Sequence, residues 1–194
     1  MSKFTRLRPA NLAMILLLIL MLPFVKNALE ASMTTQMLVQ IPLLVLVGWL
    51  LQDAIPKRLA ANIAAWNSHG MASLILTMFA AAYWMLPRTL DATTGNTLMA
   101  MAKYSLVPLL IGLPLALSWP RMNFIIKGVV MLEFIATFFR LGWLYATSPS
   151  RLCNNYLLGD QQRLGQYMLI IGAVLLAWIT FKLLFGRFEA RATR

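Results

Sequence analysis

Six apolar runs follow one another along this chain of 194 residues, and each is close to the length that a helix needs to cross a bilayer. Only 12% of the residues are charged, against about a quarter in a soluble domain. The sequence therefore predicts an all-α, polytopic membrane bundle, with residues 1–194 forming one transmembrane domain. We place the six spans at residues 10–26, 36–52, 67–87, 103–119, 126–147 and 165–186.

Basic residues gather at the ends of these runs and predict the topology. With the N-terminus in the cytoplasm, eleven Lys and Arg residues fall on the inner side. Five fall outside, namely Lys26, Arg88, Lys103, Arg151 and Arg163. This asymmetry predicts that both termini are cytoplasmic, in a bacterial inner membrane. Contact with lipid headgroups explains the net charge of +11, so nucleic acid is not an expected partner.

The first run has two interpretations. Ala28 and Ala31 offer the small residues of a signal-peptide cleavage site. The run is long for a signal peptide and continues into the second span, which favours an uncleaved anchor.

Motifs for soluble-enzyme chemistry are missing from the sequence. It has no phosphate-binding glycine loop, no Cys-x-x-Cys and no His-Glu-x-x-His. One histidine, His69, and six carboxylates leave little for acid–base catalysis, and a lone interfacial histidine is more often a hydrogen-bonding residue than a ligand. We therefore expect a protein that binds and does not catalyse.

Two charges, Glu133 and Arg140, fall inside the fifth run. They are seven residues apart, which places them on one helix face about 10 Å apart along the axis. Intramembrane charges usually face the bundle interior and pair there. The pair is expected to fix helix packing, or alternatively to serve a proton path or an anion contact.

Sulfur side chains recur on the predicted outer side. Most methionines in an apolar chain are packing residues. Thioethers and thiolates nevertheless favour Cu(I), so their accumulation on one side predicts a candidate soft-metal site. The first candidate ligands are Met33, Met37, Met85 and Met101, with Cys153 behind them.

The stretch from Tyr145 to Met168 resembles the C-terminal signature of the CtaG-type cytochrome c oxidase assembly factors. In that signature an aromatic residue and a proline precede an Asp-Gln-Gln-x-x-Gly-x-x-Met sequence. Here the match is carried by Asp160, Gln161, Gln162, Gly165 and Met168. Weaker echoes lie in residues 33–48 and in Tyr83-Trp-Met-Leu-Pro87.

The chain departs from that family at its histidines. Methionine stands at Met37 and Met85, with Met33 a further such position, and Met99 or Met101 lies near another histidine segment. The resemblance implies copper handling, or assembly of a respiratory oxidase with an oxidase subunit as membrane partner. The histidine losses allow either a Met-based Cu(I) site or loss of metal binding. Alternative functions are a metal-free accessory subunit of a larger complex, or a small transporter that uses Glu133 and Arg140.

Overall fold

The computed structural model describes residues 9–67 and 69–185, and every regular element in these ranges is a helix. The first half of the chain forms α1 (Pro9–Met21), α2 (Pro23–Glu30), α3 (Met33–Thr35), the π-helical η1 (Gln36–Gln40), α4 (Ile41–Leu51), the 3-10 turn η2 (Gln52–Ala54), α5 (Lys57–Trp66) and α6 (Met71–Trp84). The second half forms α7 (Pro87–Gly95), α8 (Thr97–Val107), the π-helical η3 (Pro108–Gly112), α9 (Leu113–Ser118), α10 (Phe124–Thr147) and α11 (Leu158–Phe185).

Three continuous helices are long and apolar enough to cross a membrane. They are Met33–Ala54, Thr97–Ser118 and Leu158–Phe185. Two bent pairs, α1 with α2 and α6 with α7, raise the number to five if each pair is one span. The described residues thus form an all-helical structure, as predicted, with three to five candidate membrane spans where we predicted six.

Two of the predicted spans are bent, because a proline interrupts each of them. The axes turn by 71° between α1 and α2 and by 65° between α6 and α7. Leu22 and Leu86, which precede Pro23 and Pro87, have ψ angles of 131° and 132°. Proline disfavours the helical conformation at the residue before it, so each helix ends there and a new one starts.

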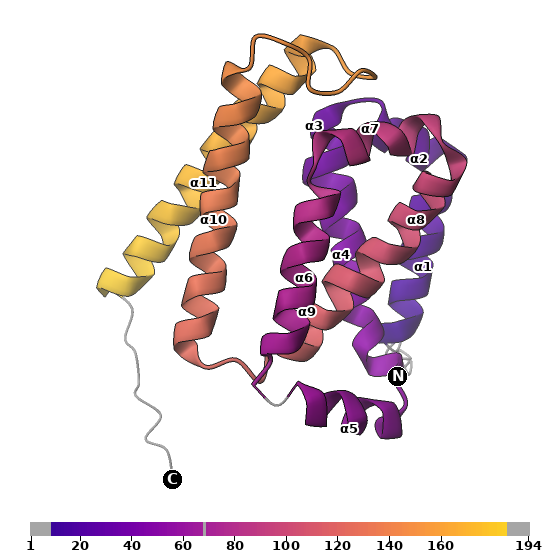
Figure 1. Ribbon diagram of the computed structural model, residues 1–194, viewed down its shortest axis with the longest axis vertical. Coiled ribbons are helices and arrows are strands. Elements are labelled where there is room, and N and C mark those ends of the chain that lie inside the picture. Colours follow the sequence, from indigo (N-terminus) through magenta and orange to yellow (C-terminus); the bar gives the residue numbers. More distant parts are fainter. Residues whose placement is uncertain (1–8, 68, 186–194) are drawn as a thin grey trace, which may run out of the picture.

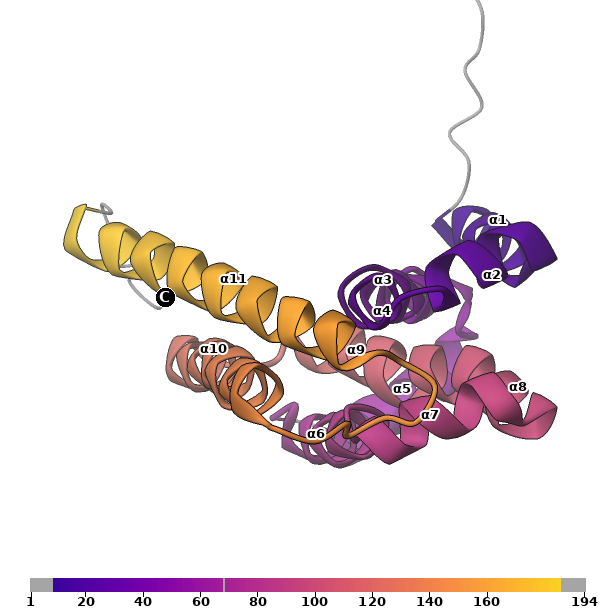
Figure 2. The ribbon, with the colours of Figure 1, turned by 90° about the horizontal axis from the view of Figure 1, so that it is seen from above.

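The helices form a bundle with a hairpin beside it (Figure 1). Within the bundle, α1 packs on α4, α4 on η3 and α9, and α6 on α9. Helices α10 and α11 pack mainly on each other and project to one side, as Figure 2 shows from above. Contact between α3 and α11 joins this hairpin to the bundle.

The two ends of the bundle differ. At one end α5 runs across the bundle (Figure 1), with Trp66 89% exposed and Leu59 51% exposed. Such a short, amphipathic helix suits the membrane surface. At the opposite end lie α3, α7 and the connection between α10 and α11 (Figure 1). Polar side chains are buried at this second end.

Helices α4 and η3 touch through their backbones. A Cβ atom added to Gly48 would lie 2.0 Å from the Pro108 carbonyl oxygen, and one added to Gly112 would lie 2.2 Å from that of Val45. Membrane helices use small residues in this way to approach closely. This contact sets the distance between the two continuous helices that form the centre of the bundle.

Candidate functional site

A buried ion pair lies at the α3–α7 end of the bundle. The Nζ atom of Lys103 is 2.6 Å from Oε1 of Glu30, and their side chains are 0% and 10% exposed. Glu30 is the last residue of α2, and Lys103 lies in α8. The topology count placed Lys103 on the outer flank of a span. In the structure it lies within the continuous helix Thr97–Ser118, and its side chain is fully buried.

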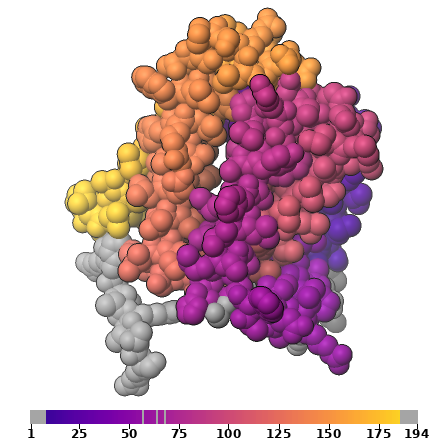
Figure 3. Space-filling model, viewed as in Figure 1, coloured from indigo at the N-terminus to yellow at the C-terminus, as the bar shows by residue number. Residues whose placement is uncertain are grey.

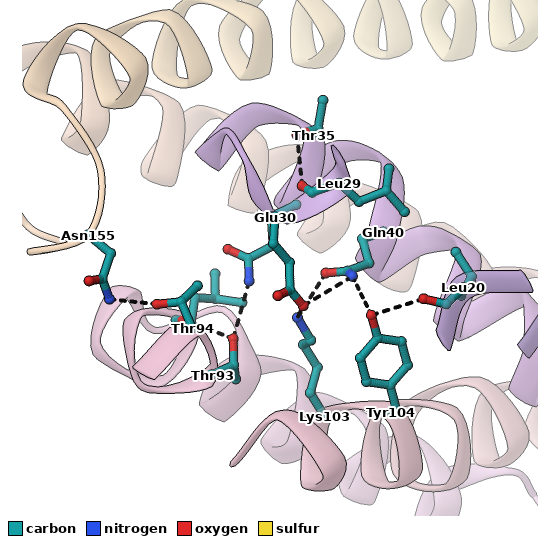
Figure 4. Close-up of polar contacts among 12 residues, drawn as sticks. Leu20, Leu29, Glu30, Thr35, Gln40, Thr93, Thr94, Lys103, Tyr104 and Asn155 are labelled. Atoms are coloured by element: carbon teal, nitrogen blue, oxygen red, sulfur yellow. Dashed lines mark hydrogen bonds and ion pairs between the residues drawn. The ribbon is translucent and has the colours of Figure 1, made fainter. Parts of the chain in front are cut away.

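Hydrogen bonds from Gln40 link this ion pair to the bend between α1 and α2. Its Oε1 accepts a hydrogen bond from Lys103 Nζ at 2.9 Å. Its Nε2 donates to the Tyr104 hydroxyl at 2.8 Å and to Glu30 Oε1 at 3.3 Å. The Tyr104 hydroxyl in turn donates to the backbone carbonyl of Leu20 at 3.1 Å, just before the bend (Figure 4). A neighbouring helix thus satisfies a carbonyl at the bend, as an apolar environment requires.

A second branch of hydrogen bonds starts from Gln36. Its Nε2 donates to Thr93 Oγ1 at 3.2 Å, and its Oε1 accepts from the Tyr156 hydroxyl at 2.8 Å. Tyr156 also lies 3.0 Å from the backbone oxygen of Glu30. Because both glutamines are fully buried, these bonds decide how α2, η1, α7 and the 148–157 connection fit together.

Asn155 forms hydrogen bonds that hold the 148–157 connection against α7. Its backbone N–H donates to Asp91 Oδ1 at 2.9 Å, and its side-chain Nδ2 donates to the Asp91 backbone oxygen at 3.0 Å. The same Nδ2 atom bonds Thr94 (Figure 4). Residues that are more than 60 positions apart in the chain are thereby fixed side by side.

The residues of the family-like signature close this connection. Gln161 is 2% exposed; its Oε1 accepts from the backbone N–H of Leu152 at 2.8 Å, and its Nε2 lies 3.4 Å from the Tyr145 and Ser150 carbonyls. Asp160 lies in the first turn of α11, where a negative charge is favourable. Gln162 is exposed. Of these three signature residues, Gln161 is the one whose hydrogen bonds hold the connection against the start of α11.

Four sulfur side chains are among the buried residues of the hydrophobic core. Their exposed fractions are 0% for Met33, 3% for Met37, 2% for Cys153 and 3% for Met168. Met85, also a candidate ligand, is half-buried and packs against this core. The sequence could not predict that all four side chains are buried, because burial depends on how α3, η1, α11 and the 148–157 connection pack.

The candidate ligand Met101 lies elsewhere. It is 58% exposed on α8 and lines a shallow surface groove of about 270 Å³ with Leu17 and Leu109. Met101 is therefore dropped from the candidate set, and Met168 takes its place. We name Met33, Met37, Cys153 and Met168 the sulfur cluster.

The Cys153 thiol is held in its neutral form. It donates a hydrogen bond to the Pro87 carbonyl oxygen, with Sγ at 3.4 Å. Burial, and secondarily the charge of Asp91, raise its pKa to about 11. A metal binds the thiolate, so Cys153 is a weaker candidate than the methionines, which need no deprotonation.

This pKa makes a prediction about reactivity. Since only the thiolate is alkylated, labelling of the folded protein by a small haloacetamide should be slow at pH 8. The rate should rise about tenfold per pH unit with no plateau below pH 10. Folding favours the protonated thiol, because the Cys153 pKa is higher in the folded than in the unfolded protein. The stability that this difference contributes is therefore lost only as the pH rises above about 9. Rates measured by mass spectrometry test this, and a plateau near pH 8.5 would contradict it.

One buried hydroxyl beside the sulfur cluster lacks a partner. The Tyr145 hydroxyl forms no hydrogen bond within the described part of the chain. It lies within electrostatic range of Cys153. A buried hydroxyl without a partner costs about 1–3 kcal/mol. Such a group in a native protein calls for an explanation, and a bound ion or ligand is one.

The Glu133–Arg140 pair forms, but it does not face the bundle interior. Arg140 contacts Glu133 on the surface of α10, where the two side chains are 62% and 39% exposed. The prediction of an interior position was therefore wrong for the single chain. Among the described residues, the buried ion pair is that of Glu30 with Lys103, which sequence reasoning missed. A signal was present in Gln36 and Gln40, two glutamines at helical spacing next to an apolar run.

The described residues offer no group of three or more His, Cys, Asp or Glu side chains that could hold a metal ion. Comparisons with family models, curated proteins and solved structures found nothing that matches this chain. The resemblance to the CtaG-type factors stays a prediction.

Proposed function

We propose that this protein is a non-catalytic membrane accessory factor that binds Cu(I) through thioethers, in the manner expected of a CtaG-like assembly factor for a respiratory oxidase. It would act in a bacterial inner membrane. The observation that carries the proposal is the sulfur cluster. Met33 and Met37 lie one helical turn apart, Met168 lies more than 130 positions further along the chain, and all three are buried in the hydrophobic core.

The residues present fit a soft monovalent ion. Thioethers are soft ligands that select Cu(I) over harder divalent cations. They are neutral, so a site built from them binds without proton release and tolerates apolar surroundings. The Tyr145 hydroxyl gives the same region a polar atom without a partner. In this proposal Met33, Met37 and Met168 hold the metal, and Cys153 and Met85 surround it.

The proposal predicts specific loss of copper. Protein expressed with copper and purified in detergent under reducing conditions should contain about one copper per chain. The M33L/M37L variant should contain none, because leucine keeps the apolar volume and removes the sulfur. Copper is measured by mass spectrometry, with protein concentration from amino-acid analysis.

The matched control is M101L, which changes a methionine outside the sulfur cluster and should bind like the wild type. Thermal unfolding shows whether each variant folds. Wild-type protein without copper after reconstitution with Cu(I) would overturn the proposal, and so would equal loss in both variants.

A second candidate is an accessory subunit without metal. The hydrogen bonds among Glu30, Gln40 and Lys103 favour it, because a buried network whose members bond one another fixes helix packing and needs no ligand. Copper-free protein that stays bound to one large membrane complex through purification would support this function. The transporter hypothesis loses support, since its two charged residues lie on the outer surface of α10.

A further inference from the structure

Helix α10 contains the predicted span 126–147, and its neighbour α11 is one of the candidate membrane-spanning helices. The two helices pack along each other, with Gly142 against Gly165 and Gly172 against Phe139. A Cβ atom on Gly165 would lie 2.5 Å from the backbone nitrogen of Ala146, so the backbones are in direct contact. These two crossings place Arg140 level with residues 165–172 of α11. Since α11 is 28 residues long, this level is close to its middle.

The ion pair on α10 is therefore exposed at a depth where lipid would surround it. Arg140 is 62% exposed and Glu133 is 39% exposed. Large apolar side chains flank the pair, with Leu132 62% and Trp143 67% exposed. Figure 3 shows that α10, in orange, is uncovered on the face in view. Charged side chains within the hydrocarbon region are costly and nearly always covered by protein. Something other than lipid must cover this face.

Glu133 and Arg140 of one copy can form hydrogen bonds with the same two residues of a second copy. Arg140 donates to Glu133 and, at 3.3 Å, to Thr137 Oγ1, and both bonds leave from the same nitrogen, Nη2. A guanidinium carries five N–H donors and a carboxylate has two oxygens, so both groups have further bonds to offer. A second copy inserted with the same topology presents the same two groups at the same depth.

We propose that this face of α10 is the interface between two copies of the chain. A two-fold axis along the membrane normal brings the two ion pairs together, and each guanidinium then donates to the carboxylate of the other copy. Such an isologous contact is the commonest symmetry of protein dimers. It removes four charged groups from lipid at once, and buries Leu132 and Trp143 beside them.

Charge-altered chains test the interface. Full-length protein is labelled with donor and acceptor dyes in separate batches and reconstituted at low density into phosphatidylcholine vesicles, where energy transfer reports association. E133R gives every chain two arginines at this site, and R140E gives every chain two carboxylates. Each variant alone should dimerise about tenfold more weakly than the wild type, because like charges then face each other.

Mixing the variants separates a direct contact from a folding defect. E133R with R140E should restore energy transfer to near the wild-type value, since opposite charges meet across the interface. The double swap E133R/R140E keeps both charges in one chain and should dimerise like the wild type. Wild-type chains that stay monomeric would overturn the proposal and assign this face to a different membrane protein. A mixture no better than either variant alone would also overturn it.

Discussion

Replacing Lys103 with methionine is expected to lower the free energy of unfolding by about 3–5 kcal/mol. The variant leaves the Glu30 carboxylate without its cation, 10% exposed and surrounded by apolar helices. It also removes the donor to Gln40. Unfolding in mixed micelles of SDS and dodecyl maltoside, followed by circular dichroism, measures the change.

The double variant E30L/K103M separates the ion pair from its burial. Removing both charges leaves no unpaired ion, and replacing a buried pair by apolar residues is often neutral. The double variant should therefore recover most of the stability that K103M loses. If K103M alone were as stable as the wild type, the pair would not be buried as the structure shows.

The second large effect is expected at the crossing of α4 and η3. Alanine at Gly48 puts a Cβ atom 2.0 Å from the Pro108 carbonyl oxygen, and this backbone atom cannot rotate away as a side chain can. The helices must separate, and we expect G48A to cost about 3 kcal/mol or more. The same unfolding assay measures it, together with the yield of folded protein.

Gly128 provides the matched control for this prediction. It lies in α10, and a Cβ atom there would meet nothing within 4 Å. G128A should be neutral or stabilise the protein slightly, because alanine favours the helix over glycine by about 0.5–1 kcal/mol. Equal stability of G48A and G128A would contradict the close crossing.

The buried polar network and the sulfur cluster share one structural cause. Both lie where the chain leaves regular α-helical geometry: at the bends after Leu22 and Leu86, in the π-helical Gln36–Gln40, and in the 148–157 connection. Such irregular turns leave backbone groups that need partners, and π-helical turns occur often at functional sites. The polar side chains at this end supply partners such as the Tyr104 hydroxyl.

The sequence predicted what depends on local pattern. The apolar runs showed that the chain is helical and inserts in a membrane, because burial of so much apolar surface leaves few alternatives. The sequence also indicated that the Glu133 and Arg140 side chains can contact each other, since residues seven apart on a helix lie on one face about two turns apart. The placement of Met33, Met37 and Cys153 on the outer side of the membrane stays a prediction.

Tertiary structure alone decided which charges face the core. Glu30 and Lys103 are 73 residues apart, with Glu30 between two predicted spans and Lys103 at the start of another, so no local pattern joins them. The two prolines that bend the chain and the glycines that let α4 meet η3 bring them together. Met101 left the candidate site and Met168 joined it for the same reason. A helix fixes only the order of its faces, and its neighbours determine which face is buried.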